Sequence, residues 1–283
     1  MVGVTSQVGK SLVIALKDHG IQVAGSSRTL MHFDECSVHQ FDSTQWKIHP
    51  PTKGVDAIIV LSPLPSIEFA IQIAELLGAH HLIAFGSTGV FSKSSSTNLI
   101  EREFVHDQLA AEELLIRRTS ELNISWTLFR PTMIYGAGTD QNVTFIRSVI
   151  RRFRAFPIPL GARGLRQPVH VEDLADACVK VLNNPATFDR AYNLGGGEVI
   201  EYAEMVRRIC RADGLPARLI PIPRMLYRWS IRLARHVPGL AYLSEAMVDR
   251  MFTDLTTDHS DAERDFGYAP RKFQPPGRVA TNL

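Results

Sequence analysis

The chain has 283 residues, of which 45% are hydrophobic, and it carries a formal net charge of +2. That length can bury a large core and suffices for one large domain or two small ones. The charge is too small to indicate nucleic acid as a partner, and no segment approaches the roughly 20 apolar residues that span a bilayer. No export signal opens the chain, so we expect a cytoplasmic protein without a transmembrane segment.

The three cysteines, Cys36, Cys178 and Cys210, stand far apart in the sequence. Their number is odd, and their spacing differs from that of metal-binding pairs. We therefore expect buried thiols in a reducing compartment and no metal site.

The first two-thirds of the chain alternates short apolar runs with amphipathic stretches, which is typical of β-α-β units and a parallel sheet. Strands are predicted over residues 22–26, 55–61, 81–85, 125–130, 167–171 and 192–194. Helices are predicted over residues 8–18, 67–78, 101–123, 142–156 and 172–184. From residue 201 onward helices predominate, apart from one predicted strand over 218–222.

This order of elements predicts an α/β protein with a doubly wound parallel sheet and a small, mostly helical C-terminal cap. The expected dinucleotide-binding core spans residues 1–135, and residues 165–195 return to it. The expected substrate-binding cap comprises residues 136–164 and 196–283.

The segment Gly3-Val4-Thr5-Ser6-Gln7-Val8-Gly9 leads directly into the first predicted helix. A Rossmann-type dinucleotide site needs small residues here, because the backbone turns tightly and the pyrophosphate approaches the helix N-terminus. Gly3 and Gly9 meet two of these needs, and Ser6 stands where a further glycine is usual. The predicted cofactor contacts in this turn are Gly3, Thr5, Ser6, Gln7, Val8 and Gly9.

Several later segments strengthen this interpretation because they follow the turn in a fixed order. They are Phe85-Gly86-Ser87-Thr88-Gly89-Val90-Phe91, Leu109-Ala110-Ala111-Glu112, Arg130-Pro131-Thr132-Met133-Ile134-Tyr135-Gly136, Pro168-Val169-His170-Val171-Glu172-Asp173-Leu174-Ala175 and Tyr192-Asn193-Leu194-Gly195-Gly196. Over roughly residues 3 to 215 the chain resembles the extended short-chain dehydrogenase/reductase family, in its nucleotide-sugar epimerase and dehydratase branch. The resemblance implies a Rossmann-type fold, a nicotinamide cofactor and a nucleotide-sugar substrate.

The N-terminus departs from the pattern of this family. Only Met1 and Val2 precede Gly3, where the family has a full strand at the centre of the sheet. Removing a central strand would leave its two neighbours with unpaired backbone groups. Either the sequence begins too late, or the first strand is shortened.

The cofactor type is predicted from the end of the second strand. The family's NAD-dependent members usually carry an acid there, whereas this chain has Gly25-Ser26-Ser27-Arg28. Ser27 and Arg28 could bind a 2′-phosphate, so we favour NADP over NAD. The alternative for Arg28 is an ordinary exposed loop residue. Asp42 resembles the acid that contacts adenine in the family, although an Asp beginning a turn would look the same.

The catalytic pattern of the family is incomplete in this chain. Active members pair a Tyr with a Lys four residues later: the Tyr hydroxyl transfers a proton while the Lys ammonium lowers its pKa. Here Phe104 stands at the Tyr position and Gln108 at the Lys position, whereas Ser87 matches the family's Ser. Gln108 could still hydrogen-bond a ribose hydroxyl, but the standard proton relay is missing.

A substitute acid would have to come from a neighbouring position. Asp107 lies about 60° from Phe104 around an ideal helix and is the best candidate, although a solvated helix Asp is the simpler interpretation. His106 falls on the opposite side. His170 and Tyr135 resemble family residues with structural roles.

The substrate side offers two arginines. Arg166 stands where the family often carries an Arg for the substrate diphosphate, and Arg163 is close to it; both could equally be plain surface residues. Met133 replaces a family Asn that often contacts the substrate, which indicates a less polar or differently placed ligand.

Two functions remain open from the sequence. One is an NAD(P)-binding protein with weak or no standard activity, acting as a subunit, sensor or assembly partner. The other is an active epimerase or oxidoreductase that uses a substitute acid. A homodimer is a further expectation.

Overall fold

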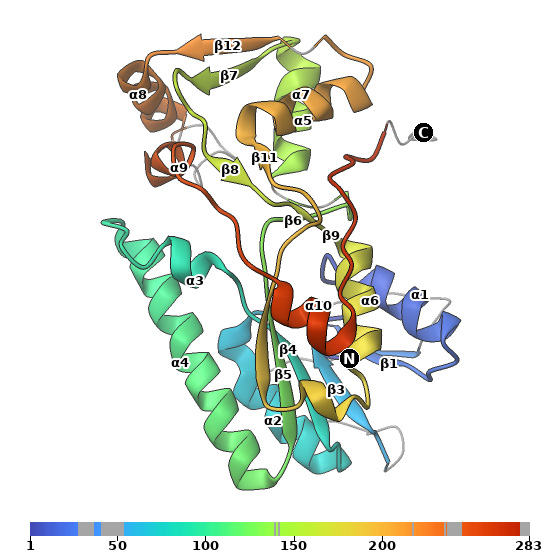
Figure 1. Ribbon diagram of the computed structural model, residues 1–283. Coiled ribbons are helices and arrows are strands. Elements are labelled where there is room, and N and C mark those ends of the chain that lie inside the picture. Colours follow the sequence, from blue (N-terminus) through green and yellow to red (C-terminus); the bar gives the residue numbers. More distant parts are fainter. Residues whose placement is uncertain are drawn as a thin grey trace.

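A computed structural model describes residues 1–27, 54–138, 140, 142–216, 218–234, 236 and 245–277, and the backbone alone of residues 37–40. Figure 1 shows a lower layer built around a sheet and an upper layer of helices and short strands. The sheet strands are β1 (Ala24–Ser27), β2 (Ser37–Gln40), β3 (Ala57–Val60), β4 (His81–Phe85), β5 (Ser125–Pro131) and β10 (Arg190–Leu194).

All neighbours in this sheet are parallel. One half has the order β10-β5-β4-β3, and the other half pairs β1 with β2. Val2 joins the halves through parallel bridges to both Ser26 and Val60. The resulting order, β2-β1-Val2-β3-β4-β5-β10, reverses direction at Val2, and ligands of doubly wound sheets bind at such a switch point.

Met1 and Val2 occupy the central position of the sheet, between β1 and β3. Val2 donates its backbone N–H to the Ile59 carbonyl and accepts from the Leu61 N–H, both at 2.8 Å. On the other side Ser26 donates to the Met1 carbonyl at 2.9 Å. The backbone groups that would otherwise face an empty slot between β1 and β3 are thus paired at this level of the sheet.

Helices cover both faces of the sheet. On one face lie α1 (Gly9–Asp18), α6 (Val171–Val181) and α10 (Ser260–Phe266), and on the other α2 (Ile67–Leu77) and α4 (Leu99–Leu122). The short η1 (Leu64–Ser66), α3 (Gly89–Ser92) and η2 (Pro185–Thr187) lie in connections. The doubly wound parallel sheet predicted from the sequence is confirmed.

The upper layer is the cap. Its helices are α5 (Val143–Phe153), α7 (Tyr202–Ala212), α8 (Arg224–Ala234) and α9 (Glu245–Arg250). Its strands are β6 (Ile134–Tyr135), β7 (Phe156–Pro159), β8 (Leu165–Arg166), β9 (Val169–His170), β11 (Ile200–Glu201) and β12 (Leu219–Ile222), which form two-stranded pairs.

Several sequence expectations differ from the structure, and the helix predicted over 172–184, for example, ends at Val181. The helix predicted over 142–156 ends at Phe153, and Phe156 begins β7. The strand predicted over 167–171 is reduced to Val169–His170. Residues 260–268, which the sequence assigned to the cap, pack in the core, where Phe266 and Tyr268 join the cluster of α1 and α6.

No helix among the described residues is long and apolar enough to cross a membrane.

Candidate functional site

The glycine turn lies at the carboxyl end of the Val2 segment. Gly3 has a φ of +81°, which favours glycine, and the turn is closed by backbone bonds from Ser6 to Gly3 and from Gly9 to Ser6. A Cβ on Gly9 would lie 1.9 Å from the Val4 carbonyl oxygen, so only glycine lets α1 begin this close to the turn.

Polar atoms of this turn are buried without partners. The Ser6 Oγ and Gln7 Oε1 atoms are both buried, and neither has a hydrogen-bond partner among the described residues. Buried polar atoms are nearly always hydrogen-bonded, so unpaired ones ask for an explanation such as a missing ligand. Both adjoin the N-terminus of α1, where free N–H groups favour an anion.

The turn is linked to the end of β1 by side chains. Thr5 Oγ1 lies 3.3 Å from the Ser27 Oγ, and the Ser27 residue is 5% exposed. Val8, the N-cap residue of α1, is buried. Arg28 and Asp42, which the sequence assigned to the cofactor, lie outside the described residues.

A second group of predicted residues meets beyond the carboxyl end of β4. Ser87 accepts a hydrogen bond from the Gly89 N–H at 3.0 Å. A Cβ on Gly89 would lie 3.0 Å from the Ser87 Oγ and 3.2 Å from Cε1 of Phe104. Ser87 and Phe104 therefore converge on Gly89, and the structure brings these two predicted residues together.

Helix α4 holds Phe104 and Gln108 in this place. Its N-terminus is capped by Asn98, which accepts from two backbone N–H groups of the first turn. Further along, Arg130 of β5 binds both carboxylate oxygens of the buried Glu112, with 2.9 Å between Nε and Oε1. This bidentate pair fixes α4 on the sheet. Gln108 is 6% exposed, and its amide makes no hydrogen bond with the described residues.

The candidate substitute acids are exposed to solvent or held in structural contacts. The Asp107 side chain is 52% exposed and lies 3.3 Å from Nδ1 of His106, which is 81% exposed. His170 accepts from the Glu172 N–H and caps α6, and burial holds its pKa below the ordinary value. The hydroxyl of the fully buried Tyr135 accepts from the Gln274 N–H. The structure thus gives these residues structural or solvent contacts, and catalysis by Asp107 stays a prediction.

The predicted substrate residues differ in exposure and in partners. Arg163 is exposed, and Met133 packs against the apolar cluster of the cap. Arg166 is 6% exposed and donates to the backbone carbonyls of Leu165, Arg250 and Thr253. Burial lowers the pKa of Arg166 to about 10. Its role with a diphosphate stays a prediction, and in this arrangement its guanidinium holds the segment after α9.

The sequence reasoning missed an ion pair between core and cap. The Arg250 guanidinium, at the end of α9, binds the Glu101 carboxylate in the first turn of α4. Ser96 donates a second hydrogen bond to the same carboxylate at 2.7 Å. These contacts hold the pKa of Glu101 below its usual value, even though burial acts to raise that pKa. Because the partners are 149 residues apart, no local pattern could have indicated the pair.

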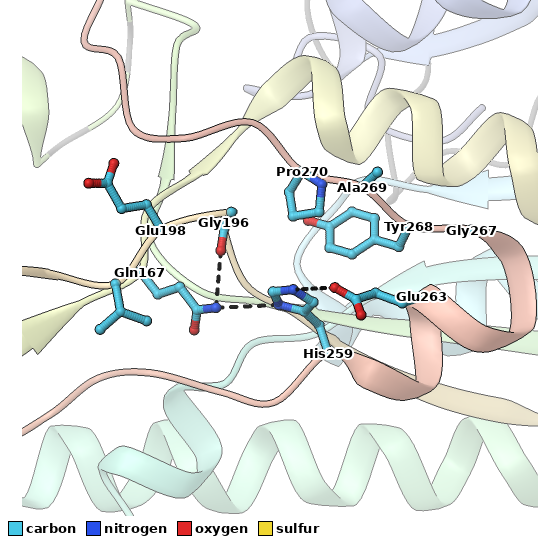
Figure 2. A pocket seen from close by; sticks show the side chains of 11 residues that line it. Gln167, Gly196, Glu198, His259, Glu263, Gly267, Tyr268, Ala269 and Pro270 are labelled. Atoms are coloured by element: carbon cyan, nitrogen blue, oxygen red, sulfur yellow. Dashed lines mark hydrogen bonds and ion pairs between the residues drawn. The ribbon is translucent and has the colours of Figure 1, made fainter.

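A hollow of about 580 Å³, shown in Figure 2, was also not expected from the sequence. Its polar lining is internally bonded. Gln167 donates to the Gly196 carbonyl and accepts from the Thr257 N–H, which orients its amide so that Nε2 faces Nδ1 of His259. The Nε2 of His259 is 3.1 Å from Glu263. These bonds tie the strand end of β10 to α10, a structural arrangement.

The remaining candidate chemistry is limited. Cys178 and Cys210 are free and buried, as expected, and burial raises the pKa of both thiols. No cluster of three metal-ligating side chains occurs within the described part of the chain.

Comparison with known proteins identifies the family of this chain. The family model of the NAD dependent epimerase/dehydratase family matches residues 1–195. A UDP-glucose 4-epimerase of Vibrio cholerae is 23% identical over 180 residues, which are 63% of this chain and 52% of that protein. An NAD(P)H azoreductase of Xenophilus azovorans is 23% identical over 233 residues, 78% of this chain and 76% of its own length. This chain thus spans about half the length of the Vibrio relative.

Solved structures agree in fold. MoeE5 in complex with UDP-glucuronic acid and NAD superposes with a TM-score of 0.71 at 17% identity, covering 96% of this chain and 93% of MoeE5. At this identity the likeness establishes the Rossmann-type fold and nothing further.

Proposed function

The chain belongs to the NAD dependent epimerase/dehydratase family, and from that premise we propose that it binds a nicotinamide dinucleotide at the glycine turn but has weak or no standard activity. The observation that carries the binding proposal is the close fit of Gly9 against Val4 beside two buried, unpartnered polar atoms. Titration calorimetry with NADP⁺ and NAD⁺ tests it directly. The absence of binding heat with both NADP⁺ and NAD⁺ would refute it.

The residues present suit the cofactor. Gly3, Ser6, Gln7 and Gly9, with Thr5 and Val8, would hold the pyrophosphate at the N-terminus of α1. Gln108, buried with an unused amide, would bind a ribose hydroxyl. When bound, such a cofactor supplies hydride transfer.

We propose NADP as the preferred cofactor. The support is chemical: Ser27 ends β1 beside Thr5, and Arg28 follows it with a guanidinium that suits a 2′-phosphate. We expect Arg28→Ala to weaken NADP⁺ binding about tenfold or more while leaving NAD⁺ unchanged. Lys17→Ala, at an exposed position of α1, is the matched control. Equal affinities for both dinucleotides in every variant would refute the preference. Asp42 would contact the adenine, as the family resemblance implies.

The proposal of weak activity depends on Phe104. Its ring adjoins Ser87, as the family's Tyr is expected to, but it has no hydroxyl to move a proton, and Gln108 has no charge. General acid–base catalysis is worth about 10²–10⁴-fold. We therefore expect the double variant Phe104→Tyr, Gln108→Lys to accelerate oxidation of UDP-glucose by bound NAD(P)⁺. Phe104→Tyr alone should do less, because an unassisted Tyr has a pKa of about 10.

A second function is favoured by the retained Ser87 and by the relatives. Ser87 keeps a hydroxyl beside Phe104, and two of the relatives are named as an epimerase and an NAD(P)H azoreductase. The chain would then be an active NAD(P)-dependent epimerase or oxidoreductase with a substitute acid. Wild-type turnover that is lost in Asp107→Asn would identify Asp107 as that acid.

For the substrate we propose a nucleotide sugar, since MoeE5 binds UDP-glucuronic acid and the Vibrio relative is named for UDP-glucose. Arg163 or Arg166 would contact its diphosphate, and Met133 would leave one family contact apolar. Cytoplasmic location, homodimer formation and the absence of nucleic-acid binding remain proposals from composition and family.

A further inference from the structure

Lys93 lies directly after α3, in a segment that the sequence patterns left without a role. Its backbone N–H bonds to the Gly89 carbonyl at 3.0 Å and closes the turn that also holds Ser87. Its side chain folds back so that Nζ lies 4.0 Å from the centroid of the Phe104 ring. Ser87, Gly89, Lys93 and Phe104 therefore gather around one turn at the carboxyl end of β4.

The side chain of Lys93 is half-buried, and its ammonium has few polar contacts. It makes no hydrogen bond or ion pair with the described residues; its only contact of this kind there is the ring face of Phe104. An ammonium has three hydrogen-bond donors, and no described residue accepts from those of Lys93. This arrangement is suited to receive an oxygen of a bound ligand.

The charges around Lys93 come from two other elements. Glu101 of α4 attracts it, but that carboxylate is already engaged by Arg250 and Ser96. Arg250 of α9 repels it. Burial and Arg250 together outweigh Glu101 and lower the pKa of Lys93 below its ordinary value, which makes the ammonium a better acid.

We infer that Lys93 is the proton donor of this site, acting on the oxygen of a carbonyl compound held against Ser87 and Phe104. In the reductive direction an N–H bond of Lys93 breaks as an O–H bond forms on the acceptor, and the neutral amine regains its proton from water. The two electrons and the hydrogen on carbon come from the reduced nicotinamide, so the inference rests on dinucleotide binding. The role of the Phe104 ring is then to hold the Lys93 ammonium through a cation–π contact.

The first test does not depend on turnover. Lysines are reductively methylated with ¹³C-formaldehyde, and the Lys93 resonance is assigned by its loss in Lys93→Arg. We expect this resonance to shift on addition of NADP⁺ but not of 2′,5′-ADP, which lacks the nicotinamide. We also expect it to titrate below the ordinary lysine value of about 10.4. A Lys93 resonance that ignores NADP⁺, in a protein shown by calorimetry to bind it, would overturn the inference.

The second test measures proton transfer. The probe is 9,10-phenanthrenequinone, and the readout is single-turnover oxidation of bound NADPH. We expect Lys93→Met to slow the reaction about 10²-fold. The wild-type rate should fall as pH rises through the pKa of Lys93, and the variant should lack this fall. Lys17→Met, at an exposed position, should match the wild type.

The outcomes separate the two proposals. No binding of NADP⁺ by calorimetry refutes the proposed function itself. Binding without any wild-type reduction of the quinone above the rate in buffer overturns the role of Lys93 as a proton donor. Full rescue by Lys93→Arg also overturns it, because a guanidinium keeps the charge but does not release a proton.

Discussion

His81 should make the stability of the fold sensitive to mild acid. This residue of β4 is 0% exposed, and its Nε2 lies 2.9 Å from the Thr127 Oγ1. Since the Thr127 hydroxyl donates its own hydrogen to the Thr187 carbonyl, Nε2 must carry the proton. The Nδ1 atom is buried without a partner among the described residues, so a second proton there would add an unsatisfied charge.

The direction and size of this effect on stability follow from the pKa of His81. Burial is the main cause that lowers the pKa of His81 from 6.5 to about 4, with a smaller contribution from His80. Between these values the unfolded chain binds the proton and the folded chain does not. Stability is therefore complete above pH 6.5 and falls as the pH falls toward 4. At 1.36 kcal/mol for each unit of pKa, the loss is about 2 kcal/mol at pH 5 and about 3 kcal/mol in the limit.

Urea unfolding between pH 5 and 8 measures this effect. His81→Gln has no titrating group and should lose most of the slope, at some cost in stability at pH 8. His19→Gln, at an exposed position of the first helix end, should keep the wild-type slope. If His81→Gln and the wild type lose stability in parallel, the buried neutral imidazole is not the cause.

Three further perturbations follow from contacts of the described residues. Gly9→Ala forces its Cβ toward the Val4 carbonyl oxygen, so we expect the free energy of unfolding to fall by about 1–3 kcal/mol. We also expect weaker NADP⁺ binding by calorimetry. Wild-type stability and affinity in this variant would contradict the close fit. Arg250→Met leaves the Glu101 carboxylate buried without its cation. We expect the thermal midpoint to drop at pH 7 but less at pH 4, where protonation removes the unpaired charge of Glu101. Adding Glu101→Gln in the same chain should restore part of the loss, and failure to do so would argue against direct coupling of the two residues. Cys178 should resist alkylation in the native protein and react only after unfolding, as mass spectrometry would detect.

The middle of the sheet could be predicted because β3 and β4 are almost continuous apolar runs. The strand over His81–Phe85 was predicted at its observed bounds, and the helix over 67–78 ends where Gly78 adopts a φ of +72°. Such runs carry their own signal, since a strand buried on both faces has no polar alternation. The cap was harder: the strand β7 follows α5 closely, and its apolar residues continue the helical pattern.

The candidate site divides in the same way. The position of Phe104 beside Ser87 could be expected from the order of motifs, because the family pattern fixes which residue of α4 faces the strand end. Lys93 could not, because it lies after a four-residue helix whose segment has no periodicity, and only the fold of the turn brings it over the ring. The pairing of Glu101 with Arg250 depends on how the cap is placed above the core, which no local pattern contains.

The two halves of the site make different physical demands. A dinucleotide is held by backbone shape, and the turn around Gly9 depends on the absence of side-chain atoms, which tolerates no substitution. Proton transfer instead depends on where one titratable atom lies, and a side chain satisfies it if it reaches the same oxygen and can release a proton. Phe104 itself offers no proton donor, and the Glu112–Arg130 pair holds α4 in its place. The Lys93 ammonium that lies over the Phe104 ring has only to meet an acceptor to act as the acid that we infer for this site.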